Sequence, residues 1–165
     1  MTSGFRWRET LEALDSFGVE FILIGGLAAN LHGSPTVTMD IDICQSRSPA
    51  NLENLAGCLR SLEARLRGVD DDVPFLLDAA TLEAGDSFTC ITVNGSLDCL
   101  GTPLGTTGFD DLAKNAVPMK LGDSLLRVSS LDDLIRMKRA AARPKDRVEV
   151  EILGALRQAL AEGQT

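Results

Sequence analysis

The chain has 165 residues, of which 44% are hydrophobic and 24% are charged. This length suits a single domain spanning residues 1–165, and the composition predicts a packed core and excludes an intrinsically disordered chain. The formal net charge of −8 argues against a broad nucleic-acid-binding face. The longest apolar run, 21–24, is far too short to cross a bilayer.

Cysteine spacing and the N-terminal residues indicate a protein of the reducing cytoplasm. The four cysteines lie far apart and include no C-x-x-C pair, which argues against zinc ligation and against a disulfide framework. We therefore expect reduced, mostly buried thiols. Residues 1–6 lack the cationic and apolar segments of a signal peptide, so a cytoplasmic location without a membrane anchor is expected.

Hydrophobic periodicity predicts alternating helices and strands in the N-terminal half. Apolar residues at helical spacing predict a helix over 7–17, and a long amphipathic helix that begins at the Ser48-Pro49 cap and continues through Leu66. Between these two helices the sequence predicts a buried strand over 19–24, a short helix over 27–31 and a strand over 39–44.

Short strands precede two helices in the C-terminal half. Residues 68–72 predict an acidic loop, and 73–85 fit either a strand or a turn with a short helix. Turn pairs and caps predict hairpins over 87–100 (around Asn94-Gly95) and 117–128 (around Gly122-Asp123), and helices over 109–114, after Ser130 and over 144–161. This order predicts an α/β (α+β) fold with a mixed sheet, a core of about residues 5–128 and a C-terminal helical part of about 129–162.

A glycine pair and two aspartates carry the main chemical signal. Gly25-Gly26 ends a strand and opens a helix, so free backbone N–H groups can meet a phosphate chain at close range. Asp40 and Asp42 lie at i and i+2 on a strand and therefore share one face. Two carboxylates side by side suit a hard cation such as Mg²⁺ or Mn²⁺. Glycines for phosphates and carboxylates for a metal are the parts that nucleotidyl transfer needs.

Each part also has a purely structural interpretation. A glycine pair after a strand is often only a turn, and alternating aspartates can form the solvent face of an edge strand. The combination of glycines and aspartates favours a metal site. The like charges of Asp40 and Asp42, on a strand anchored by apolar Ile41 and Ile43, repel each other unless a bound cation reduces the repulsion. Asp98 is the candidate third carboxylate, since a charge between Leu97 and Cys99 either faces this cleft or an exposed surface.

Lys138 is the candidate cation. Residues 136–147 hold six basic side chains and one acidic one, a local charge of +5 that leaves −13 for the rest of the chain. Such a window suits a small polyanion, one contact on RNA, or a solvated helix face. Lys138 falls within an apolar helical stripe, so it either reaches an edge or pairs with an anion in a cleft. Glu149 is a possible structural partner for it or for Lys145.

Two segments carry a resemblance to a known superfamily. The first is Gly25-Gly26-Leu27-Ala28-Ala29-Asn30-Leu31-His32-Gly33, continuing to Thr38-Met39-Asp40-Ile41-Asp42, and the second runs from Leu131 through Lys138 to Arg143-Pro144-Lys145-Asp146. They resemble the nucleotidyltransferase superfamily of the DNA polymerase β type, and more closely the bacterial AbiEii/AbiGii-like toxins with which the MenT toxins are grouped. The resemblance spans roughly residues 5–155.

The resemblance implies roles for individual residues. Asp40, Asp42 and Asp98 would bind Mg²⁺ or Mn²⁺, and Gly25 and Gly26 would hold the phosphates of a nucleoside triphosphate (NTP). Lys138 would act in catalysis and, with Arg143 and Asp146, in nucleotide binding. One departure is Thr36, which stands where relatives often carry an arginine.

Two functional hypotheses follow. The first is an enzyme that moves a nucleoside monophosphate from an NTP to a hydroxyl on RNA (such as tRNA) or on a protein, as the toxin of a toxin–antitoxin system. The second is a weakly active or inactive module of the same fold that senses nucleotide or binds a partner such as a cognate antitoxin. Thr36 favours the second hypothesis.

Overall fold

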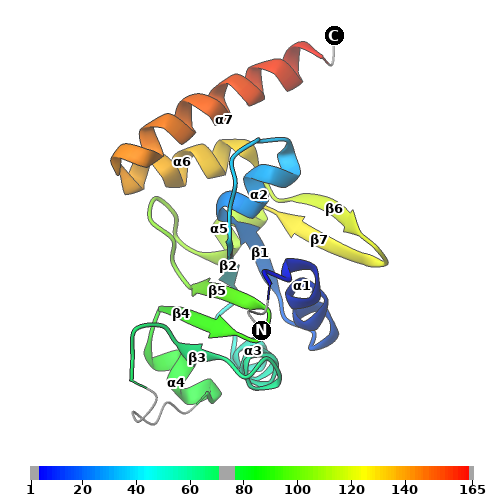
Figure 1. Ribbon diagram of the computed structural model, residues 1–165, viewed down its shortest axis with the longest axis vertical. Helices are drawn as coiled ribbons and strands as arrows, with labels where there is room; N and C mark the ends of the chain where they lie inside the picture. The colour runs from blue at the N-terminus through cyan, green and yellow to red at the C-terminus, as the bar shows by residue number, and fades with distance from the viewer. Residues whose placement is uncertain (1–3, 71–76, 164–165) are drawn as a thin grey trace.

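The computed structural model describes residues 4–70 and 77–163, which form a mixed seven-stranded sheet with helices packed against it (Figure 1). The strands are β1 (Phe21–Ile24), β2 (Asp40–Gln45), β3 (Arg65–Leu66), β4 (Ser87–Thr92), β5 (Gly95–Leu100), β6 (Val117–Leu121) and β7 (Ser124–Val128), in the order β3-β4-β5-β2-β1-β7-β6. The β2–β5 and β1–β7 pairs are parallel, and the other neighbours are antiparallel. The mixed α/β class predicted from the sequence is confirmed.

Seven helices flank the sheet within residues 4–70 and 77–163. They are α1 (Trp7–Ser16), α2 (Gly25–His32), α3 (Pro49–Ser61), α4 (Ala79–Ala84), α5 (Phe109–Ala113), α6 (Leu131–Ala141) and α7 (Pro144–Glu162). The Ser48 hydroxyl accepts the Asn51 backbone N–H at 3.3 Å, and the Ser130 hydroxyl accepts that of Asp133 at 3.1 Å. Each bond satisfies a backbone N–H that lacks a partner inside its own helix.

The prediction that α3 continues through Leu66 is wrong, because this helix already ends at Ser61. Glu63 adopts a positive φ of 52° and donates its backbone N–H to the Arg60 carbonyl at 3.1 Å. This left-handed residue reverses the chain, so that Leu66 pairs with β4 at the edge of the sheet. Leucines at helical spacing continue past the break, which is why periodicity alone missed it.

The two predicted hairpins are present, one with a shifted turn. Thr92 pairs with Gly95, so the turn residues of the β4–β5 hairpin are Val93 and Asn94. The β6–β7 hairpin turns at the expected pair, since Leu121 is opposite Ser124. The predicted acidic loop and unassigned segment fall partly on 71–76, outside the described residues, and α4 lies just after that gap.

The two faces of the sheet are covered unequally. Alternate residues of the central strands, such as Leu23, Ile41 and Ile43, belong to the large core under α1, α2 and α3. On the opposite face, Ile24 and Cys44 pack with Leu112 of α5 in a small cluster of buried residues. Asp40 and Asp42 share this second face, so they lie beside the part of the sheet that α5 covers.

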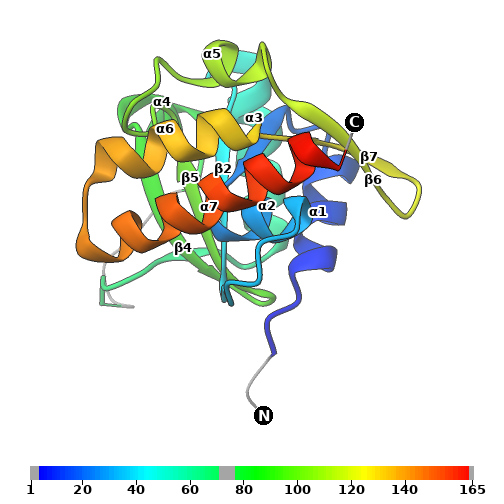
Figure 2. The ribbon, with the colours of Figure 1, turned by 90° about the horizontal axis from the view of Figure 1, so that it is seen from above.

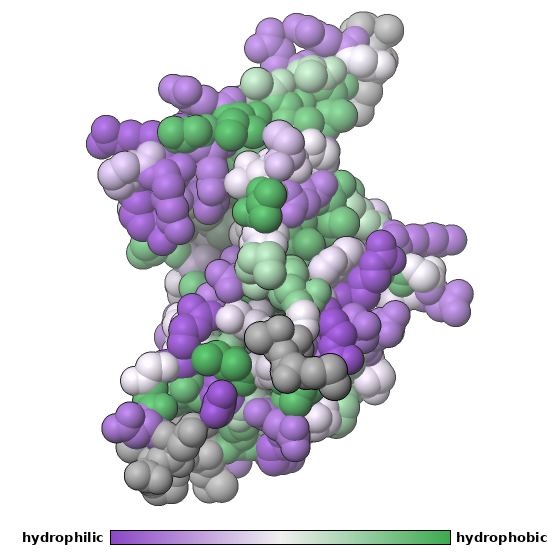
Figure 3. Space-filling view, in the orientation of Figure 1, coloured by the Kyte–Doolittle hydropathy of each residue, from purple (hydrophilic) through white to green (hydrophobic). Residues whose placement is uncertain are grey.

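Helices α6 and α7 lie side by side over one end of the sheet (Figure 2). Only Asp146 and Leu153 of α7 are buried. Figure 3 shows hydrophobic residues at the surface in the region of this helix. Its side chains Val148 and Leu160 are 58% and 43% exposed. No helix among residues 4–70 and 77–163 is long and apolar enough to cross a membrane.

Candidate functional site

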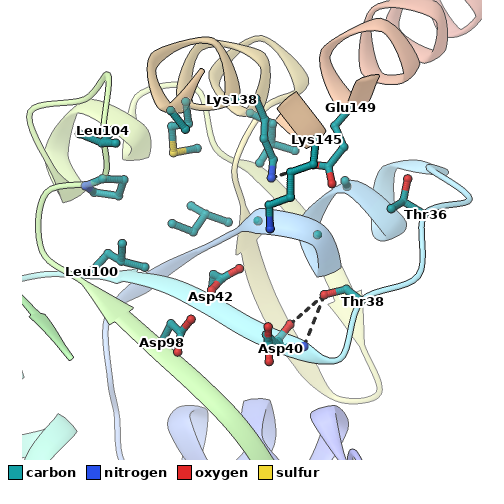
Figure 4. A pocket seen from close by; sticks show the side chains of 18 of the residues that line it. Thr36, Thr38, Asp40, Asp42, Asp98, Leu100, Leu104, Lys138, Lys145 and Glu149 are labelled. Carbon is teal, nitrogen blue, oxygen red and sulfur yellow. Dashed lines mark hydrogen bonds and ion pairs between the residues drawn. The ribbon is translucent and has the colours of Figure 1, made fainter. Parts of the chain in front are cut away.

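Three carboxylates meet on two adjacent strands. Asp40 and Asp42 come from β2, and Asp98 of β5 is the direct partner of Asp42 in the parallel β2–β5 ladder. All three side chains line one cavity and lie close together beneath α6 and α7 (Figure 4). Residues paired across two strands project from the same face of a sheet, so this cluster follows directly from the β2–β5 register.

The acidic cluster shifts the protonation of its members. Burial, followed by the charges of Asp98 and Asp40, raises the pKa of Asp42 to about 7. Burial also raises the pKa of Asp98, although the Arg67 guanidinium opposes this. A raised carboxyl pKa is typical of clustered carboxylates that lack enough positive charge.

Arg67 is the cation that contacts the acidic cluster. Its guanidinium donates to the Asp98 carboxylate at 3.2 Å and lies 4.0 Å from that of Asp40. The backbone N–H of Arg67 donates to the Thr89 carbonyl on β4, which holds the residue at the edge of the cavity. Sequence reasoning missed this residue, because nothing in the local pattern indicates that the chain after α3 returns to β4.

The glycine pair lies beside Asp42 in the wall of the cavity. Gly25 has a φ of +73°, and a Cβ at this position would overlap the Asp42 carboxylate oxygen Oδ2. A Cβ on Gly26 would lie 2.9 Å from the Thr38 side chain. Helix α2 begins at Gly25 with no side-chain cap from Ile24. Its first N–H groups therefore lack a side-chain acceptor from the N-cap residue at a point where Gly25 and Gly26 line the cavity, an arrangement that attracts anions.

The loop between α2 and β2 is fixed by local hydrogen bonds. Asn30 Nδ2 donates to the carbonyls of Ser34, at 3.0 Å, and Thr36. The Thr38 hydroxyl accepts the backbone N–H of Asp40 at 3.4 Å and donates to its carbonyl at 3.3 Å. Thr36 and Thr38 both line the cavity, so the position at which relatives often carry arginine holds a short neutral side chain here.

Lys138 is the centre of an ion-pair network between α6 and α7. Its Nζ lies 2.7 Å from Glu149 Oε2 and 3.5 Å from Asp146 Oδ1. Burial raises the pKa of Asp146, but hydrogen bonds from Arg143 outweigh it and the net shift is downward. Asp146 also accepts the backbone N–H of Arg143 at 3.1 Å, which caps α7. The expected pairing of Glu149 with Lys138 is therefore present.

The cavity has a volume of about 630 Å³, within the range of small-molecule sites. Of the eight residues to which the sequence analysis gave a site role, seven line it: Gly25, Gly26, Asp40, Asp42, Asp98, Lys138 and Arg143. The Asp146 side chain is fully buried behind this wall. The exposed side chains of Val37, Met39 and Leu104 stand at the rim. The roles assigned to all of these residues stay predictions.

The donor chemistry of the acidic cluster fits a hard divalent cation. The space that a Cβ on Gly25 would fill gives access to the Asp42 oxygen, and carboxylate oxygens are the ligands that Mg²⁺ and Mn²⁺ prefer. Within residues 4–70 and 77–163, no three Asp, Glu, His or Cys side chains are already arranged as a metal-binding group. Arg67 already contacts the carboxylates of Asp98 and Asp40, so a cation bound there would compete with its guanidinium.

Comparison with known proteins identifies the fold. No protein-family model matches the sequence, and no curated protein matches it. The chain is similar to the crystal structure of ANT(2'')-Ia in complex with adenylyl-2''-tobramycin, with a TM-score of 0.56 and 15% identity over 96% of this chain and 97% of that one. The solution structure of the antibiotic-resistance factor ANT(2'')-Ia gives a TM-score of 0.53 and 16% identity over 96% and 90% of the two chains. The chain thus has the nucleotidyltransferase fold.

Proposed function

We propose that the protein transfers a nucleoside monophosphate from an NTP to an acceptor hydroxyl and releases pyrophosphate. One observation carries this proposal: in a nucleotidyltransferase fold, three carboxylates and an uncapped glycine helix start line the same cavity. An acidic side for a metal and an N–H side for phosphates are the two elements that phosphoryl chemistry requires.

The backbone N–H groups and the carboxylates of the cavity would have different roles. The first N–H groups of α2, at Gly25 and Gly26, would hold the phosphate chain. Asp40, Asp42 and Asp98 would hold Mg²⁺ or Mn²⁺, which when bound would neutralise phosphate charge and polarise the α-phosphate. Catalysis would then depend on positioning and charge compensation, with no covalent step on the protein.

The proposed step forms one bond and breaks one. The acceptor oxygen bonds to the α-phosphorus, and the bond from that phosphorus to the bridging oxygen of pyrophosphate breaks. Asp98 would take the proton of the attacking hydroxyl. Burial raises the pKa of Asp98, so without a bound cation its carboxylate is a stronger base than an ordinary one.

The acceptor is proposed as a hydroxyl on RNA, such as tRNA, or on a protein. The ANT(2'')-Ia complex holds adenylyl-2''-tobramycin, so a small-molecule hydroxyl is a further acceptor class for the same assay. From the resemblance to AbiEii-like proteins we also infer a cytoplasmic bacterial toxin with a cognate antitoxin. Expression of the protein in bacteria, alone and together with the product of each neighbouring gene, would test that inference. Growth arrest that no neighbouring gene product relieves would count against a cognate antitoxin.

A transfer assay tests the enzyme proposal. The protein is incubated with each labelled NTP, Mg²⁺ and, in separate reactions, total RNA, a protein extract and small polyhydroxylated compounds. We expect label on one acceptor class, loss of transfer with EDTA, and at least a 100-fold loss in Asp42→Ala, in line with the usual contribution of metal-assisted charge stabilisation. Transfer that persists in Asp42→Ala would remove the proposed mechanism.

The alternative is a nucleotide-sensing or partner-binding module. Two observations favour it: Thr36 offers no positive charge to a phosphate, and Glu149 and Asp146 already neutralise Lys138. This alternative predicts NTP binding by calorimetry without transfer product on any acceptor. Transfer above the level of Asp42→Ala would exclude it.

A further inference from the structure

Four basic side chains line the cavity, and three of them already have carboxylate partners. Arg67 pairs with Asp98, Lys138 with Glu149, and Arg143 with Asp146. The fourth is Lys145, which has no ion-pair partner among residues 4–70 and 77–163. An incoming anion could bind the three paired cations only in competition with carboxylates, whereas Lys145 is available to it at no such cost.

Lys145 also has the right position. It follows Pro144 at the first turn of α7, where the backbone contributes partial positive charge. Figure 4 shows its side chain descending from α7 into the cavity, so that the ammonium group lies above the acidic cluster and below Lys138. Lys145 and the uncapped start of α2 both line this cavity, so a side-chain cation and unpaired backbone N–H groups are available to the same anion.

The buried network behind Lys145 explains why it stands there. Asp146 is the next residue along the chain, and its fully buried carboxylate lies 3.5 Å from Lys138 and 2.8 Å from the Arg143 guanidinium. These contacts fix the first turn of α7 against α6. Lys138 forms ion pairs with Asp146 and Glu149, which both belong to α7. It therefore holds in place the end of α7 from which Lys145 projects.

We propose that Lys145 is the basic side chain that binds the phosphate chain alongside the N–H groups of α2, and that Lys138 is a positioning residue. The inference deepens the proposed function, on which it rests, since it names the cation that compensates the triphosphate. A phosphate chain beside three carboxylates needs added positive charge, and Lys145 supplies it without giving up an ion pair among residues 4–70 and 77–163.

The test compares Lys145→Gln, Lys138→Gln and the remote control Lys120→Gln, which all remove one positive charge. Calorimetry with Mg²⁺ measures binding of inorganic tripolyphosphate and of each NTP, and thermal melting measures stability. We expect Lys145→Gln to weaken tripolyphosphate binding by about tenfold or more with an unchanged melting temperature. Lys145→Arg should restore most of the affinity. Lys138→Gln should instead lower the melting temperature by at least about 5 °C, because it leaves Asp146 buried without its lysine.

The outcomes separate this inference from the proposed reaction. Tripolyphosphate affinity in Lys145→Gln equal to that of Lys120→Gln would overturn the inference, whether or not the wild type transfers nucleotide. Loss of binding in Lys145→Gln, with no transfer product from the wild type, would support the inference and refute the reaction. A wild-type protein that binds neither tripolyphosphate nor any NTP would overturn both. For Lys138, a Lys138→Gln variant that keeps the melting temperature of the wild type but loses tripolyphosphate affinity as Lys145→Gln does would overturn the positioning role.

Discussion

Replacing Asp42 with asparagine should stabilise the metal-free protein above neutral pH and abolish its response to Mg²⁺. The carboxyl has an ordinary pKa of 3.8, which the unfolded chain keeps, and a folded pKa of about 7. Between these values the folded state binds more protons than the unfolded state, so stability falls as pH rises through this window. Above the pKa that Asp42 has in the folded state, the loss of stability is complete. Asparagine avoids this loss because its amide is neutral, like the protonated acid.

The size of the effect follows from the same shift. A rise from 3.8 to about 7 corresponds to an upper limit of about 4 kcal/mol at alkaline pH. Asp98 shares the proton with Asp42, and solvent in the cavity screens the repulsion. We therefore expect a gain of about 1 to 2 kcal/mol for Asp42→Asn at pH 8, or about 3 to 6 °C in melting temperature.

Thermal melting in EDTA at pH 8 and at pH 4 measures this gain. The gain should be large at pH 8 and nearly absent at pH 4, where the carboxyl of the wild type is protonated. Mg²⁺ should raise the melting temperature of the wild type at pH 8 and leave that of Asp42→Asn unchanged. Asp123→Asn, in the exposed β6–β7 turn, makes the same charge change far from the cavity. An equal gain in Asp123→Asn, or a gain in Asp42→Asn that does not depend on pH, would refute the reasoning.

Three further variants test other parts of the site. Gly25→Ala should lower stability by about 1 to 3 kcal/mol in thermal melting, because it strains a φ of +73° and crowds the Asp42 carboxylate. Asp146→Asn should lower stability by about 3 kcal/mol or more, since Lys138 loses a fully buried carboxylate partner. Arg67→Gln should strengthen Mn²⁺ binding, measured by electron paramagnetic resonance, by about three- to tenfold, because it removes a competing cation.

Each of these variants has a matched control in the chain. Gly154→Ala lies in the middle of α7 with open space around the new methyl group, so it should leave stability unchanged or raise it. Asp132→Asn removes an exposed partner of Arg157 and should change stability by less than about 1 kcal/mol. Arg47→Gln breaks a surface pair with Asp86 and should leave Mn²⁺ binding unaltered. A control that behaves like its test variant contradicts the corresponding prediction.

The sequence by itself determined the parts that depend on local chemistry. Ser48 and Ser130 predicted their helix starts, because a capping hydroxyl needs only the next turn of chain. The pairing of Asp40 with Asp42 on one face followed from the period of a strand. The glycine pair, with the aspartates after it, indicated the fold that the comparison with solved structures supports.

Only the tertiary structure decided which groups meet across the sheet and across the cavity. The β2–β5 register sets Asp98 beside Asp42, and the chain reversal at Glu63 carries Arg67 back to them. No local pattern encodes either contact, because each depends on strands that are distant in sequence. The packing of α7 on α6 likewise neutralises Lys138 and leaves Lys145 facing the cavity. Spacing along one helix shows on which face a charge lies. Its partners come from the neighbouring helix, and these contacts pair Lys138 while leaving Lys145 without an ion-pair partner among residues 4–70 and 77–163.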